Sequence, residues 1–173
     1  MSDPRGKLAA TTTEGRAPCA GNATTPIGTT EDYFDEVRER IRTHGWMVQY
    51  VESNRTPFAY TIGLHDWGLP ELLITAVSPQ RATRLLNAVA RDAVTGSTLT
   101  PGQQIKLPAG PLIEIVEMKH PDAHLKFAVA FGGPETRALQ LVWADGRGRW
   151  PWSAAFCDGR RRQPVLGIRS RAA

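Results

Sequence analysis

The sequence predicts a single α+β domain, with a mainly antiparallel sheet and two to three helices, on the basis of three observations. Apolar residues alternate or run on through several short segments, which is the pattern of strands. Most of these segments are joined by short turns and not by helices, which argues against regular βαβ alternation. Of the 173 residues, 41% are hydrophobic, which is enough for one core.

The chain divides into a domain and two tails. Residues 1–28 contain almost no large apolar side chain and are predicted to be a disordered tail. Residues 29–166 form the predicted domain, and residues 167–173 a basic C-terminal tail. The domain begins with a helix whose capping hydroxyl is Thr29 or Thr30 and which ends at Gly45.

Two predicted strands follow this helix and form a hairpin. Residues 46–51 alternate, and residues 58–62 place Phe58, Tyr60 and Ile62 opposite small residues. Gly63 at the end of the second strand indicates a bulge or a close approach of backbone or ligand. Residues 71–77 are almost all apolar, as in a strand covered on both faces. We therefore expect Glu71 to be buried and hydrogen-bonded.

The second half of the chain adds one clear helix and further strands. Residues 79–94 have an apolar stripe, with Ser78 as the cap and Gly96 as the terminator. The other predicted elements are strands at 103–107 and 112–118, a short helix at 122–131 and an apolar strand at 138–144. The turn at 145–148 is predicted to lead back into an edge strand at 149–152.

Charge and composition narrow the class of partner. The net charge is +4, but residues 159–173 hold five arginines and no acid, so the basicity is terminal. Specific nucleic-acid binding is therefore not expected, since it needs positive charge on the folded face. No apolar run approaches the roughly 20 residues of a membrane span, and no secretory signal is recognisable. The two cysteines, Cys19 and Cys157, predict no disulfide. We expect a cytoplasmic protein without a membrane partner.

Several short motifs stand in a consistent order along the chain: His44-Gly45-Trp46, Phe58 to Leu64, Pro70-Glu71-Leu72, Leu85-Leu86-Asn87, Leu139 to Trp143 with Asp145 and Gly148, and Trp150-Pro151-Trp152. Together they resemble a bacterial family of uncharacterised proteins, the domain of unknown function 4262 family. The resemblance extends from about Tyr33 to Leu166. It implies an intracellular bacterial protein. It implies no activity, so no catalytic residue is carried over.

The aromatic residues suggest a ligand-binding pocket where the Tyr60 strand would face the last hairpin. Its predicted lining is Tyr60, Thr61, His65, Glu71, Gln140, Trp143, Asp145, Trp150 and Trp152. The alternative is that the tryptophans simply fill the core. His65 is the best acid/base candidate, although the alternative, a plain surface loop residue, is favoured over that role. His120 and His124 have ligand spacing, but Pro121 disfavours the helix, and we assign no metal site.

Two functions stay open on the sequence alone. One is a noncatalytic module that binds a small ligand or a protein, because no complete catalytic set is visible. The alternative is a small-molecule enzyme, including a flavin-dependent one, because the order of elements is loosely like a flavin-binding split barrel. No phosphate-binding loop motif occurs that would indicate a nucleotide cofactor. The sequence identifies no cofactor and no partner, and it does not establish whether the protein is an enzyme.

Overall fold

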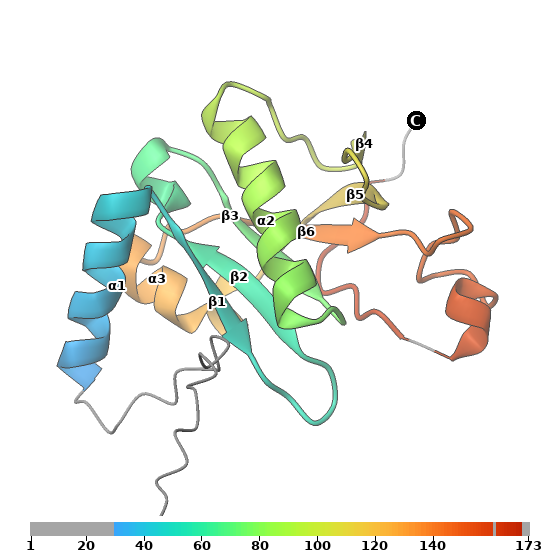
Figure 1. Cartoon of the computed structure of the whole chain (residues 1–173), viewed down its shortest axis with the longest axis horizontal. Coiled ribbons are helices and arrows are strands. Elements are labelled where there is room, and N and C mark those ends of the chain that lie inside the picture. The colour runs from blue at the N-terminus through green and yellow to red at the C-terminus, as the bar shows by residue number, and fades with distance from the viewer. Residues whose placement is uncertain (1–29, 161, 171–173) are drawn as a thin grey trace, which may run out of the picture.

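The computed structural model describes residues 30–160 and 162–170. They form a single α+β domain around one six-stranded sheet with the order β1-β2-β3-β6-β5-β4 (Figure 1). The predicted class and the mainly antiparallel sheet are confirmed, since only β3 and β6 pair in parallel. The predicted disordered segment 1–28 lies outside the described residues.

The elements follow one another in the order that the sequence suggested. The strands are β1 (Met47–Val51), β2 (Phe58–Ile62), β3 (Glu71–Thr75), β4 (Gln104–Lys106), β5 (Leu112–Glu117) and β6 (Ala138–Trp143). The helices are α1 (Thr30–His44), α2 (Pro79–Val94) and α3 (Lys126–Gly132). Short 3-10 turns complete the chain at η1 (Leu64–Trp67), η2 (Pro121–Ala123) and η3 (Phe156–Gly159).

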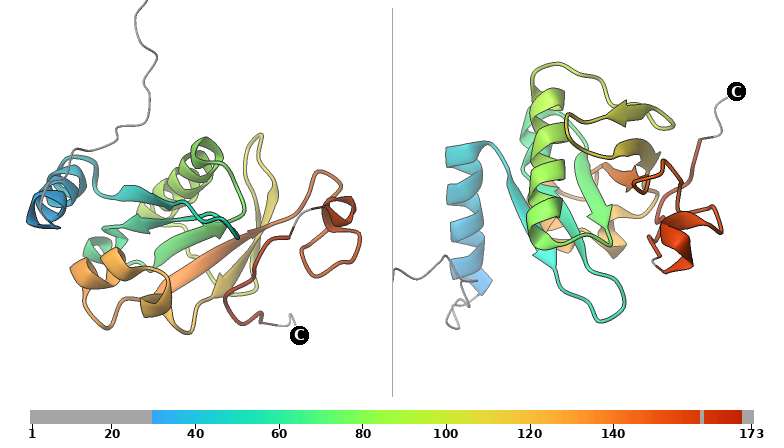
Figure 2. Two further views of the ribbon diagram at one scale, coloured as in Figure 1. Left: turned by 90° about the horizontal axis from the view of Figure 1, so that it is seen from below. Right: turned by 45° about the vertical axis from the view of Figure 1, so that its right-hand side comes forward.

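The sheet separates two apolar cores, because successive strand residues point to opposite faces. On one face, Leu72, Ile74 and Leu141 pack against the buried stripe of α2. On the other face, Tyr60 and Leu73 pack with side chains of α1 and α3. Figure 2 shows α2 and α3 on opposite sides of the sheet. The central strand β3 is buried along its whole length, as its uninterrupted apolar run predicted.

Helix α2 shows how local sequence sets an element. The Ser78 hydroxyl accepts a hydrogen bond from the Arg81 N–H, and Pro79 occupies the first turn, where no intrahelical N–H bond is lost. The short helix predicted at 122–131 begins only at Lys126, because Pro121–Ala123 forms the separate turn η2.

Two expectations about the sheet were wrong. Residues 149–152 form no strand and lie in turns, so the last hairpin is absent. The sheet is also open, with β1 and β4 at its two ends, and therefore does not close into the split barrel of the flavin analogy.

The C-terminal segment packs against the sheet beyond Leu166. Ile168 forms an isolated bridge with Glu117 on β5, and its N–H donates to the Glu117 carbonyl at 3.0 Å. Any side chain at Gly167 would collide with that carbonyl, so the glycine permits this close approach. Residues 162–170 thus run back along the face of the sheet that α3 also covers (Figure 2).

Candidate functional site

Glu71 is completely buried, as predicted, and accepts four hydrogen bonds. The Thr61 hydroxyl donates at 2.6 Å, and the backbone N–H groups of Gly63 and His65 donate at 2.9 and 3.3 Å. The fourth donor is the Nδ1 atom of the His65 ring, at 2.9 Å. Three of these bonds end on Oε1 and one on Oε2, so both carboxylate oxygens have donors although the side chain is closed to water.

Local sequence builds this network from both strand ends. Gly63 has a φ of +113°, and a side chain there would press on Ile41 and on the Gly45 carbonyl. The glycine therefore turns its N–H toward Glu71 in a conformation that other residues rarely adopt. Thr61 is tied in as well, since its hydroxyl accepts the Leu72 N–H at 2.8 Å while donating to Glu71.

His65 is held between two carboxylates at the edge of this network. Its Nδ1 contacts Glu71, and its Nε2 lies 3.3 Å from an Asp66 oxygen, with 21% of the side chain exposed. The hydrogen bond to Glu71 raises the pKa of His65 above its ordinary value, and burial opposes this only in part. The imidazole is therefore oriented through Nδ1, while Nε2 lies against the largely exposed Asp66 carboxylate.

Tyr60 and Trp143 do not meet, so the single pocket predicted from them does not form. Their strands are separated by β3, and the two side chains belong to the cores on opposite faces. Burial raises the pKa of Tyr60 to about 12. Trp143 donates from Nε1 to the Thr75 carbonyl at 3.0 Å and packs on Phe156. Both side chains are core residues; a ligand-binding role for them stays a prediction.

Gln140 fastens the C-terminal segment to the sheet. Its Nε2 donates to the Pro164 carbonyl, and its Oε1 accepts the Leu166 N–H, each at 2.7 Å. Gln163 makes a similar pair of bonds from the segment back to the sheet. Its Oε1 accepts the Trp143 N–H, and its Nε2 donates to the Trp143 carbonyl. A polar residue at the centre of an apolar strand, such as Gln140, was the visible signal, but its partners lie too far along the chain to be identified from sequence.

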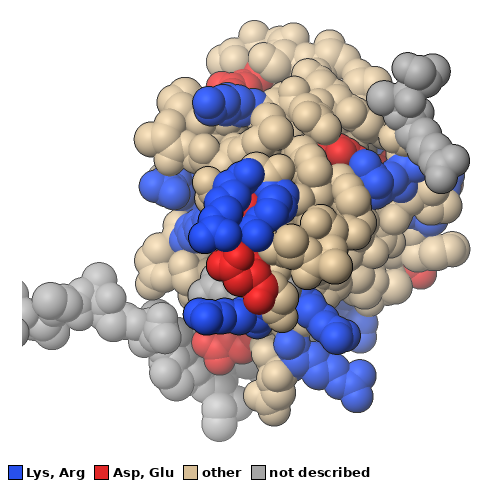
Figure 3. Space-filling model, turned by 90° about the vertical axis from the view of Figure 1, so that its right-hand side faces the viewer, with Lys and Arg blue, Asp and Glu red and all other residues tan. Residues whose placement is uncertain are grey.

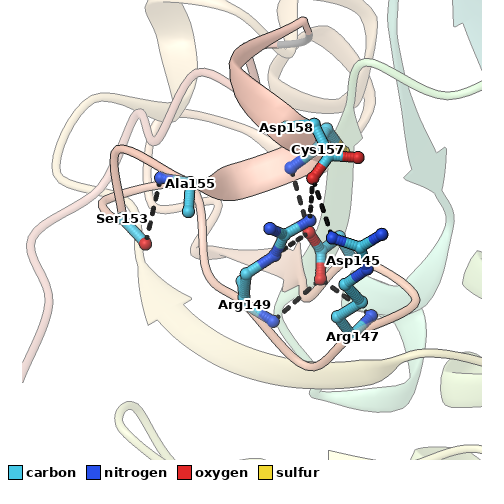
Figure 4. A network of polar contacts seen from close by, with 7 residues as sticks. All are labelled: Asp145, Arg147, Arg149, Ser153, Ala155, Cys157 and Asp158. Carbon is cyan, nitrogen blue, oxygen red and sulfur yellow. Dashed lines mark hydrogen bonds and ion pairs between the residues drawn. The ribbon is translucent and has the colours of Figure 1, made fainter.

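Asp145 organises the loop after β6 (Figure 4). Its carboxylate accepts the N–H groups of Arg147, Arg149 and Cys157, each at 2.9 Å, and the Arg149 guanidinium at 2.7 Å. Burial works to raise the pKa of Asp145, but these donors together hold it well below the usual range. Asp158 receives Arg147 and Arg149 from the other side. The cluster is internally satisfied and shapes the loop that carries the last two tryptophans.

Trp150, Trp152 and Arg169 form a layered surface group, which we call the tryptophan platform. The two indole rings are nearly parallel, with an angle of 11° and ring centroids 5.2 Å apart. The Arg169 guanidinium lies 3.4 Å from the centre of the Trp152 ring. It is also bonded to Glu114 through Nε at 2.8 Å and Nη2 at 3.3 Å. Glu114 is 3% exposed, so a buried carboxylate fixes the guanidinium on which Trp152 rests.

The structure thus does not bring the nine predicted site residues together in one place. Thr61, His65 and Glu71 share one network, and Trp150 and Trp152 share the platform; Gln140 and Asp145 fix loops, and Tyr60 and Trp143 fill the cores. Sequence reasoning missed Glu114 and Arg169. Glu114 alone carried a signal, as a charged residue between Ile113 and Ile115. Within residues 30–160 and 162–170, no group of three His, Cys, Asp or Glu side chains is placed to hold a metal ion.

Comparison with protein families gives one match. The family model described as a domain of unknown function, DUF4262, matches residues 40–157, which includes β1 to β6, α2 and the two tryptophans of the platform. No curated protein and no solved structure matches the chain.

Proposed function

The chain belongs to the DUF4262 family, a family of unknown function, and we propose that it is a noncatalytic binding module which holds a protein partner at the tryptophan platform. The observation that carries the proposal is the exposure of Trp152, of which 42% is open to solvent although it is fixed from below. A large apolar side chain that is held rigid at the surface loses little conformational entropy on binding.

The construction of the platform supports the proposal. Tryptophan and arginine are the residues that most often dominate the binding energy of protein interfaces. Here the two tryptophans stack on each other, and Arg169 joins Trp152 to the buried Glu114. If Trp152 served only the core, it would not need to be exposed. If Arg169 were an ordinary surface residue, it would not need a buried carboxylate as its partner. Ile168, the neighbour of Arg169 in the chain, is also 60% exposed.

The charge of this region favours an acidic partner. Residues 145–170 contain six arginines and two aspartates. Figure 3 looks at the side of the molecule that carries the C-terminal segment and shows more Lys and Arg than Asp and Glu there. Asp145 and Asp158 are both engaged with Arg147 and Arg149, while Arg162 is exposed. An acidic protein surface would complement this excess and accelerate association.

The proposal is tested by quantitative capture from bacterial lysate, followed by affinity measurement with the purified captured protein. Trp152→Ala is compared with Trp67→Ala, which removes another exposed tryptophan, at a remote loop. We expect an acidic protein whose affinity falls at least about tenfold in Trp152→Ala, is unchanged in Trp67→Ala, and declines with salt. Equal affinities in the two variants, or no protein whose capture depends on Trp152, would contradict the proposal.

Catalysis by His65 is the second candidate, and one observation favours it. A buried carboxylate orients the partly exposed ring through Nδ1, which is how a general base is positioned. A base must be neutral to accept a proton, however, and the raised pKa of His65 keeps it protonated to higher pH. The Nε2 atom lies 3.3 Å from an Asp66 carboxylate oxygen, a group that His65 would not activate as a nucleophile. Colour in the purified protein, or fluorescence quenching by added flavin, would favour the enzyme.

The structure bears on the location of the protein through its helices alone. Among residues 30–160 and 162–170, no helix has the length and apolar character to cross a bilayer. A cytoplasmic location remains a prediction, and so does the expectation that nucleic acids are not specific partners.

A further inference from the structure

A groove remote from the tryptophan platform lies at the free edge of β1. Among the strands of the described residues, β1 pairs only with β2, and α1 and α2 lie on either side of its other edge (Figure 1). The groove encloses about 520 Å³ and is lined by Arg40, His44, Trp46, Met47, Val48, Thr83, Asn87 and Arg91. This volume falls within the range of small-molecule pockets, roughly 300–1,000 Å³.

The groove combines an apolar floor at Trp46, Met47 and Val48 with polar side chains that can all donate hydrogen bonds. Arg40 and Arg91 come from the two facing helices, and no Asp or Glu is among the lining residues. Arg40 uses Nη2 in an exposed ion pair with Glu36, and its other N–H groups can donate to a ligand. A cavity with this charge and no acidic side chain in its wall is suited to an oxyanion.

Asn87 adds a neutral donor whose orientation is fixed. Its Oδ1 accepts the Trp46 Nε1–H at 2.9 Å, which determines which end of the amide is occupied. The Nδ2 group, with two N–H donors, is thereby left for the groove. The same bond locks the half-buried Trp46 ring, which supplies an apolar wall beside the cationic groups.

We propose that this groove binds the phosphate monoester of a small organic molecule. Two guanidinium groups, an imidazole, an amide and the Thr83 hydroxyl offer more donors than a single carboxylate accepts, and they match the three terminal oxygens of a phosphate. The Trp46 wall would contact the organic part. The site is separate from the tryptophan platform, so either proposal can fail without the other.

A second explanation for part of the charge needs no ligand. His44 is the last residue of α1 and Arg91 lies in the last turn of α2, where cations stabilise the negative end of a helix dipole. Arg40 and Asn87 lie inside their helices and are not explained in this way. A binding measurement on the folded protein separates the two explanations.

The experiment titrates the full chain with adenosine monophosphate, inorganic phosphate and adenosine by calorimetry and by Trp fluorescence. We expect saturable binding of adenosine monophosphate, weaker binding of phosphate and none of adenosine. Arg91→Gln and Arg40→Gln should each weaken binding of the monophosphate by about tenfold or more, since each removes a charge-assisted contact. Arg42→Gln is the control, because it makes the same charge change on α1 outside the groove.

Circular dichroism verifies that each variant is folded before its affinity is compared. The proposal is overturned if neither phosphate compound binds saturably at concentrations up to about 1 mM. It is equally overturned if Arg42→Gln weakens binding as much as Arg91→Gln does, because net charge and not the groove would then account for the affinity. Binding of adenosine as tight as that of its monophosphate would also refute it.

Discussion

Glu71 and Glu114 are both buried glutamates in the same sheet, and their charges are compensated in different ways. Glu71 takes its hydrogen bonds from Thr61, Gly63 and His65, all within ten residues of it in the chain. Glu114 depends mainly on Arg169, 55 residues further on. The first carboxylate closes a local turn, whereas the second fastens a distant segment and fixes a surface arginine. A buried carboxylate can thus stabilise the backbone of a local turn, or it can position a side chain at the protein surface.

The comparison predicts that Glu71→Ala is the most damaging of the substitutions in the two carboxylate networks. It leaves the buried Thr61 hydroxyl and Gly63 N–H, and the partly buried His65 N–H and ring, without their acceptor. We expect a loss of about 3 kcal/mol in the free energy of unfolding, measured with urea. Glu71→Gln keeps one carbonyl acceptor and should lose clearly less. Equal losses in both variants would mean that the negative charge matters more than the acceptor oxygens.

Arg169→Gln should be the next largest change, at about 1–2 kcal/mol in urea unfolding. The substitution leaves Glu114 buried without a cation, which is the costly half of breaking a buried pair. We discount the cost because 40% of the Arg169 side chain is exposed, so water can reach the site. In the double variant Arg169→Gln with Glu114→Gln, part of the stability should return. If the double variant is no more stable than the single one, the buried charge is not the cause.

The same contrast explains how far the sequence could predict the fold. Gly63, Pro70 and the apolar run after Glu71 are local signals, and they correctly predicted a buried, hydrogen-bonded glutamate at a strand end. The caps of α2 were equally local. The edge strand expected at 149–152 was wrong, because the apolar Trp150-Pro151-Trp152 resembles a strand while Asp145 draws the backbone into a compact loop.

The candidate site was predictable only in part, and for the same reason. The alternation at 58–62 indicated a packed face for Tyr60, and the apolar run at 138–144 indicated a buried strand for Trp143, but neither pattern says which of two cores a strand residue faces. That depends on β3 lying between β2 and β6, which is a pairing over long sequence distance. The partners of Trp152 could not be predicted either, since Arg169 belongs to a segment whose composition indicated a basic tail.

Trp152→Ala sharpens the contrast between the interior and the surface function. We expect a loss of only about 1 kcal/mol in urea unfolding, from the stack on Trp150 and the Arg169 contact. Trp143→Ala, at a fully packed position, should cost about 3–5 kcal/mol by leaving a cavity. A loss in Trp152→Ala as large as that in Trp143→Ala would show that Trp152 contributes to stability as a core residue does. That result would weaken the binding proposal.

The smallest effect, and the one most specific to Glu71, is a dependence of stability on pH. Glu114 is paired with an arginine, which stays charged at all ordinary pH values, whereas Glu71 is paired with His65. Because the pKa of folded His65 lies above its ordinary value of 6.5, the folded state holds its proton more tightly than the unfolded state. The stabilisation is fully present below pH 6.5 and is lost as the pH rises through the folded pKa. The variant His65→Asn can keep a donor near the position of Nδ1 but does not titrate. We therefore expect urea unfolding of the wild type, measured relative to this variant, to show a stability that declines from pH 5.5 to pH 8, while Arg169→Gln leaves that slope unchanged. A slope of opposite sign, or the same slope in His65→Asn, would show that another group titrates and that Glu71 does not hold a protonated His65.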